Sequence, residues 1–154
     1  MLLSYAGWEP DPWVERLPRL LEPMGIASHR VSTGQEASHV IETVPIHVAV
    51  VDLGLPMHAR SGTDQAGQAG HSGETEAGVR LLELLRRLDT QPPTVVIKRG
   101  RTSRDDRREI AAALRAGAFT VLDRPRESAD LEAMLDVLGR VLKRHYADRW
   151  PGSG

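Results

Sequence analysis

The feature that most constrains the fold is an apolar run that ends in an aspartate. Residues 46–51 read IHVAVV, and Asp52 follows them directly. The strands of a parallel sheet are covered on both faces, so they show nearly continuous, β-branched apolar runs rather than alternation. The run therefore predicts a central strand of a parallel sheet with a carboxylate at its carboxyl end.

The rest of the chain alternates short apolar runs with segments of helical period. This alternation predicts a parallel sheet with helices on both faces. Pro12 suits the first position of the first helix, and Pro18 is expected to kink or delay that helix. Gly117 is a natural helix end. The expected strands cover 2–5, 27–31, 46–51, 94–97 and 119–122, and the clearest helix covers 128–146.

Length and composition indicate one domain. The chain has 154 residues with 40% hydrophobic content, which suits a single core. We expect residues 1–147 to form this domain. Residues 57–76 are rich in Gly, Ser, Thr, Gln and Ala and have no period, which predicts a long mobile loop. Residues 148–154 are expected to be a disordered tail.

Charge and cysteine content exclude several classes of protein. The chain has 20 basic and 21 acidic side chains, so no global field attracts it to nucleic acid or to an anionic membrane. It has no cysteine, which excludes disulfides, thiolate metal sites and a cysteine nucleophile. The sequence shows no signal peptide, and no apolar run approaches the roughly 20 residues of a membrane span. We expect a soluble, cytoplasmic protein.

Three short motifs carry a family resemblance. They are VVDLGLP at 50–56, GVRLL at 78–82, and AGA at 116–118 followed by Leu122 and by RP at 124–125. Their order and spacing resemble the receiver domains of response regulators in two-component signalling. The resemblance implies a flavodoxin-like, doubly wound five-stranded parallel sheet with strand order 2-1-3-4-5 and helices on both faces. It also implies a phosphorelay signalling role rather than an enzymatic one, with Asp52 at the phospho-acceptor position.

The residues that support phosphotransfer in this family are replaced here. Receivers bind Mg²⁺ with an acidic pair after the first strand, and the matching positions are Ala6 and Gly7, which have no ligating side chain. The small hydroxyl residue that bonds the phosphoryl group in this family, at the end of the fourth strand, is replaced by Lys98. The lysine that the family has before the proline after the fifth strand is replaced by Arg124. This arginine keeps the positive charge but carries it on a planar, forked guanidinium group. We therefore expect no bound Mg²⁺ and no other cofactor, and no histidine spacing matches a zinc site.

These replacements favour an atypical, pseudo-receiver interpretation. Asp52 is expected to pair with Lys98 or Arg124, so that an internal cation replaces the metal and holds the site in one state. The chain would then act as a signalling and protein-interaction module. Two alternatives stay open. One is a conventional phospho-acceptor at Asp52, with Glu9 or Asp11 reaching back to a metal. The other is a small ligand-binding protein or enzyme on the same fold.

A basic cluster marks a candidate partner surface. The resemblance implies that the face built from the fourth helix, fifth strand and fifth helix contacts a protein partner, such as a histidine-kinase-pathway component, or a second copy in a homodimer. The alternative is a solvated helix face balanced by neighbouring acids. Without a helix-turn-helix segment or an aromatic platform, nucleic-acid binding is not expected. The cluster consists of Arg99, Arg101, Arg104, Arg107 and Arg108.

Overall fold

A parallel sheet forms the centre of the molecule. The computed structural model describes residues 1–6, 12–59, 73–98 and 103–147. All strand pairs are parallel, and the five strands lie in the order β2-β1-β3-β4-β5, which confirms the predicted fold and strand order. The strands are β1 (Leu2–Ser4), β2 (His29–Val31), β3 (Ala49–Asp52), β4 (Thr94–Ile97) and β5 (Thr120–Leu122).

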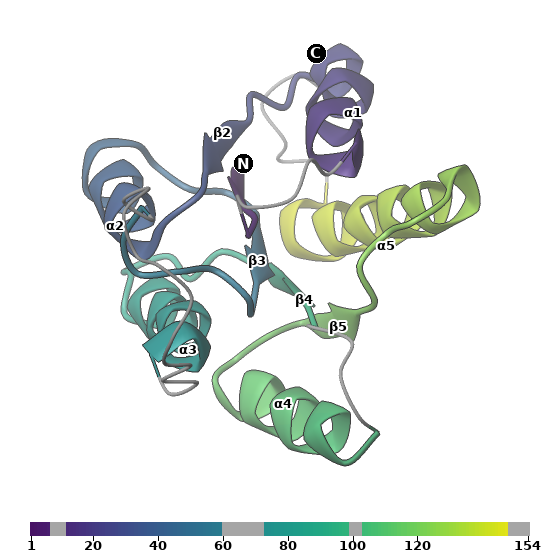
Figure 1. The fold of residues 1–154 in the computed structure, drawn as a ribbon. Coiled ribbons are helices and arrows are strands. Elements are labelled where there is room, and N and C mark those ends of the chain that lie inside the picture. The colour runs from purple at the N-terminus through teal and green to yellow at the C-terminus, as the bar shows by residue number, and fades with distance from the viewer. Residues whose placement is uncertain (7–11, 60–72, 99–102, 148–154) are drawn as a thin grey trace.

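Helices cover both faces of the sheet. In Figure 1, α1 and α5 lie on one face, whereas α2, α3 and α4 lie on the other. Within the described ranges, no helix is long and apolar enough to cross a membrane. The helices are α1 (Pro12–Leu21), the short 3₁₀ helix η1 (Glu22–Met24), α2 (Gly34–Thr43), α3 (Gly73–Arg86), α4 (Ser103–Arg115) and α5 (Ser128–Tyr146).

Each face of the sheet has its own apolar core. Val48 and Val50 pack with α1 and α5, whereas Ala49 and Val51 pack with α2, α3 and α4. Successive side chains of a strand point to opposite faces, so a strand buried on both faces must be apolar throughout. This double burial explains the unbroken apolar run at 48–51, whereas His47 before it is exposed.

The central strand is shorter than its apolar run. We expected it to begin at Ile46, but β3 begins at Ala49. Its pairing with β4 begins with Ala49 opposite Thr94, and Pro92 and Pro93 precede that residue. Proline has no N–H to extend a ladder. Ile46 and Val48 are nevertheless buried. The apolar run therefore extends beyond the residues that pair in the sheet.

Several helix ends follow from local sequence. Helix α1 begins at Pro12, as predicted, and it continues through Pro18 to Leu21, so Pro18 does not delay it. Helix α2 begins after Thr33, whose Oγ1 accepts a hydrogen bond from the backbone N–H of Glu36. Gly117 has a positive φ of 94°, which confirms its predicted place after α4.

One predicted boundary was wrong. We expected the loop at 57–76 to last until residue 76, but α3 begins at Gly73. The Gly- and Ser-rich composition before residue 73 obscured this start. The remainder of the predicted loop at 60–72, and the predicted tail at 148–154, lie outside the described residues.

Helix α3 approaches the end of β3 closely at Gly78. A Cβ atom built there would lie 2.8 Å from Cα of Leu53 and 3.1 Å from the backbone oxygen of Asp52. Both neighbours are backbone atoms next to a fully buried carboxylate, so they have little freedom to move. The glycine therefore sets the distance between α3 and the backbone of Asp52 and Leu53.

We predict that Gly78→Ala destabilises the protein even though alanine is the better helix former. Overpacking against backbone should lower the free energy of unfolding by about 1–3 kcal/mol. Gly139→Ala in α5 is the matched control, since a Cβ there meets no described atom within 4 Å, and it should raise stability by up to about 1 kcal/mol. Urea unfolding measures both. Equal stability of the two variants would contradict the prediction.

Candidate functional site

Asp52 lies where the strand order of the sheet reverses. From β1 the chain goes to β2 on one side and then to β3 on the other, so the order reverses between β1 and β3. Ligand sites of doubly wound sheets occur at this point. Asp52 is the last residue of β3 and is fully buried. The sequence-predicted acceptor position therefore coincides with the position that the topology favours.

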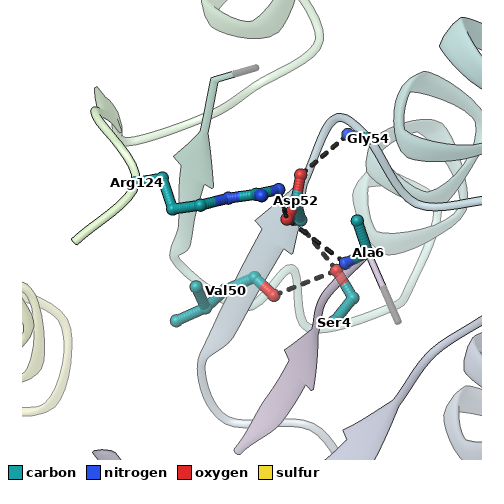
Figure 2. A network of polar contacts seen from close by, with 6 residues as sticks. All are labelled: Ser4, Ala6, Val50, Asp52, Gly54 and Arg124. Atoms are coloured by element: carbon teal, nitrogen blue, oxygen red, sulfur yellow. Dashed lines mark hydrogen bonds and ion pairs between the residues drawn. The ribbon is translucent and has the colours of Figure 1, made fainter. Parts of the chain in front are cut away.

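Both carboxylate oxygens of Asp52 accept hydrogen bonds from the protein. Nη2 of Arg124 donates to Oδ2 over 2.7 Å, and the backbone N–H of Ala6 donates to the same oxygen over 3.3 Å. The backbone N–H of Gly54 donates to Oδ1 over 2.8 Å. Figure 2 shows these donors converging on the carboxylate from different sides. A buried charge is tolerated when it is paired and hydrogen-bonded in this way.

Arg124 supplies the positive charge of the site. It follows β5 in the chain, and because β4 lies between β3 and β5, its side chain passes the carboxyl end of β4 to reach Asp52. The Arg124 side chain is 23% exposed, whereas that of Asp52 is 0% exposed. The ion pair is therefore largely removed from water, where the loss of one partner is much more costly than at an open surface.

Lys98 belongs to a separate ion cluster. Its ammonium contacts Oδ2 of Asp106 at 2.8 Å and Oδ1 of Asp123 at 3.0 Å, and its backbone N–H donates to Leu122. The hydrogen bonds with Asp106, and then those with Asp123, raise the pKa of Lys98 above the ordinary lysine value. The stabilisation that accompanies this shift is therefore complete at neutral pH and is lost only as the pH rises through the raised pKa. Of the two cations expected beside Asp52, the structure brings only Arg124 to it.

The replaced acidic pair is described only in part. Ala6 is fully buried and contributes its backbone N–H to Asp52, where the resemblance implied a metal-binding side chain. Gly7, Glu9 and Asp11 lie outside the described residues. Within the described part of the chain, no three His, Cys, Asp or Glu side chains form a group that could hold a metal ion. The expected lack of Mg²⁺ stays a prediction.

Sequence reasoning missed two contributors to the site. The backbone N–H of Gly54 bonds Asp52 through a turn two residues long, and the hydroxyl of Ser4 accepts the backbone N–H of Asp52 over 3.0 Å. Ser4 was assigned only to a strand. The sequence does hold one indication, since Ser4 is a hydroxyl residue inside an apolar run. A buried hydroxyl group almost always makes a hydrogen bond.

The structure describes three of the five arginines of the basic cluster. Arg99 and Arg101 lie outside the described residues. Arg104, Arg107 and Arg108 are exposed on α4. Of the acids expected to balance them, Asp106 is bonded to Lys98 instead. The exposed side of α4 therefore carries more positive charge than the count along the sequence suggests.

The fold is a doubly wound parallel sheet with helices on both faces. Similar solved structures are the Francisella response regulator 1452 receiver domain (17% identity, TM-score 0.63, 93% of this chain and 95% of that chain) and a CheY-like response regulator receiver domain protein from Methanospirillum hungatei (19%, 0.60, 93% and 95%). A third is a response regulator protein from Burkholderia pseudomallei with a phosphorylated aspartic acid, calcium ion and citrate (19%, 0.60, 97% and 74%). At these identities the likeness establishes the fold. No family model matches the sequence, and no curated protein matches it.

We predict that Lys98→Met loosens α4. The variant keeps most of the side-chain length but removes the ammonium that joins α4 to Asp123, so the amides of α4 should exchange hydrogen several-fold faster. Hydrogen-exchange mass spectrometry of the peptides covering 103–115 measures this. Arg30→Gln is the control, because it removes an ion pair with Glu15 that joins β2 to α1 and is exposed to solvent. Unchanged exchange in α4 of the Lys98 variant would contradict the assigned role.

Proposed function

We propose that the chain is a receiver-type module of two-component signalling that acts through protein interaction in the cytoplasm and catalyses no reaction of its own. Its site is held in one state by the Arg124–Asp52 ion pair instead of being set by Mg²⁺-dependent phosphorylation. The observation that carries this proposal is that the buried Asp52 carboxylate already has an arginine and two backbone N–H groups as donors.

The charge balance of the site supports this proposal. Transfer of a phosphoryl group to a carboxylate needs a cation that neutralises the negative charge of the approaching group, and Mg²⁺ requires hard oxygen ligands. The methyl group of Ala6 offers no such ligand. Arg124 neutralises the carboxylate itself, so the resting site has no unsatisfied charge that would draw in a metal.

The burial of Asp52 also supports the proposal that the site is not phosphorylated. A phospho-acceptor oxygen must meet a phosphodonor from solvent, but the Asp52 side chain is fully buried. Its Oδ2 accepts from both Arg124 and Ala6. Attack through this oxygen would require Arg124 to leave, and leaving a buried charge without its partner costs about 3–5 kcal/mol. This cost adds to the barrier of any phosphotransfer step.

A phosphorylation assay tests the proposal. The protein is incubated with Mg²⁺ and acetyl phosphate, or with beryllofluoride, and its intact mass and ¹⁹F spectrum are recorded. We expect no change that depends on Asp52, since the carboxylate is enclosed and paired. Asp52→Asn is the site control, and a conventional receiver domain treated in parallel shows that the phosphodonor is active. Stoichiometric modification that Asp52→Asn abolishes would overturn the proposal in favour of a conventional receiver.

The charges on α4 and beyond β5 support a partner surface. Arg104, Arg107 and Arg108 are exposed on α4, and the segment that leads from β5 into α5 exposes Asp123, Arg126 and Glu127, of which Asp123 already pairs with Lys98. In a two-fold symmetric dimer the same surface meets itself, so the α4 arginines of one copy can face Asp123 and Glu127 of the other. We therefore propose a homodimer through the α4, β5 and α5 face. A protein partner with an acidic surface is the alternative occupant.

We predict that the chain self-associates with a strong dependence on salt. Sedimentation velocity over a range of protein concentrations should show a dimer that weakens as ionic strength rises. The double variant Arg107→Glu, Arg108→Glu should shift the equilibrium toward monomer. Arg19→Glu changes an exposed charge on α1, which is not one of the elements of the α4, β5 and α5 face, and should have no effect. A monomer at every concentration would exclude the homodimer.

A further inference from the structure

Ser4 lies at the seam between β1 and β3, next to the site. It is the last residue of β1, it is fully buried, and it pairs with Val31 of β2. On the other side, the pairing of β1 with β3 ends one residue earlier, with Leu3 opposite Val50. Beyond that pair, the hydroxyl of Ser4 accepts the backbone N–H of Asp52 over 3.0 Å and donates to the backbone oxygen of Val50 over 3.3 Å.

A side chain thus takes the place of a backbone group in the ladder. Parallel strands normally satisfy such N–H and C=O groups with the backbone of the neighbouring strand. Here one hydroxyl accepts a hydrogen bond from the N–H of Asp52 and donates one to the backbone oxygen of Val50 (Figure 2). The backbone N–H of Ala6, two residues further along, then bonds the side chain of Asp52 rather than the backbone of β3.

We infer that Ser4 is a positioning residue for the Asp52 carboxylate. Its hydroxyl ends the regular ladder between β1 and β3, holds the backbone of Asp52, and so presents Oδ2 to the N–H of Ala6 on one side and to Arg124 on the other. The inference rests on the proposed function only in taking Asp52 as the centre of the site. An apolar residue at position 4 would leave the N–H of Asp52 and the carbonyl of Val50 without this partner.

The closest alternative is that Ser4 only stabilises the fold. Thr94 provides a control for it, because its buried hydroxyl donates to the backbone oxygen of Pro92 over 3.1 Å at the first residue of β4, the end of the strand opposite to the site. Thr94→Val and Ser4→Ala each remove one buried hydroxyl from the same sheet. A purely structural role predicts the same kind of general loss of stability in both variants.

Hydrogen exchange measured by NMR separates these roles. We expect the Ala6 and Gly54 amides of Ser4→Ala to exchange roughly twofold to tenfold faster than those of Thr94→Val, after correction for the global stability of each variant. The side-chain guanidinium resonances of Arg124 should shift in Ser4→Ala alone. Equal exchange of Ala6 in the two variants, with unshifted Arg124 resonances, would overturn the inference.

A second pair of variants guards against a packing effect. Ser4→Thr and Ser4→Val add similar bulk to the same buried position and differ in the hydroxyl group. The threonine variant should keep the slow exchange of Ala6, and the valine variant should lose it; equal behaviour of the pair would overturn the inference. Phosphorylation of Asp52 in the unmodified protein would refute the proposed function and leave this exchange result standing, so the two failures are distinguishable.

Discussion

The buried carboxylate of Asp52 is the constraint on which the arrangement of the site depends. A full negative charge at the seam of the sheet is stable only when donors surround it, because the interior does not solvate it as water does. Its donors come from segments far apart in the chain, with Ala6 after β1, Gly54 after β3 and Arg124 after β5. Satisfying one charge therefore fixes the carboxyl ends of three strands relative to one another. Gly78 extends this constraint to α3, since it lets the helix pack against the backbone of Asp52 itself.

The segment after β5 is held at two neighbouring residues by two different ion pairs. Asp123 bonds Lys98, and Arg124 bonds Asp52. Lys98 also bonds Asp106, so α4 is tied to the same segment. Lys98 and Arg124 thus have separate carboxylate partners, and they do not have to share one. This division gives Lys98 a role in positioning α4, although it occupies the place where the resemblance implied a phosphate-binding hydroxyl.

Local patterns predicted much of the fold because local chemistry decides it. The apolar spacing of 128–146 and the β-branched run of 94–97 match α5 and β4 residue for residue. The start of α3 was missed, since it follows a segment of low complexity. At the site, the motif containing Asp52 identified the centre, but the choice between Lys98 and Arg124 depends on which acids lie within reach in three dimensions. The role of Ser4 depends on where the ladder with β3 ends, and the sequence of β1 alone does not contain that information.

The energy of the Arg124–Asp52 pair limits how the proposed module could carry a signal. A switch needs a second state within a few kcal/mol of the first. Leaving a buried charge without its partner costs about 3–5 kcal/mol, so a state in which Arg124 has left the buried Asp52 would occupy roughly one molecule in a hundred or fewer. A partner that required that state would lose affinity by the same factor. On the proposed function, a partner therefore binds best to the paired state, and signalling depends on whether the partner is present rather than on the chemical state of Asp52.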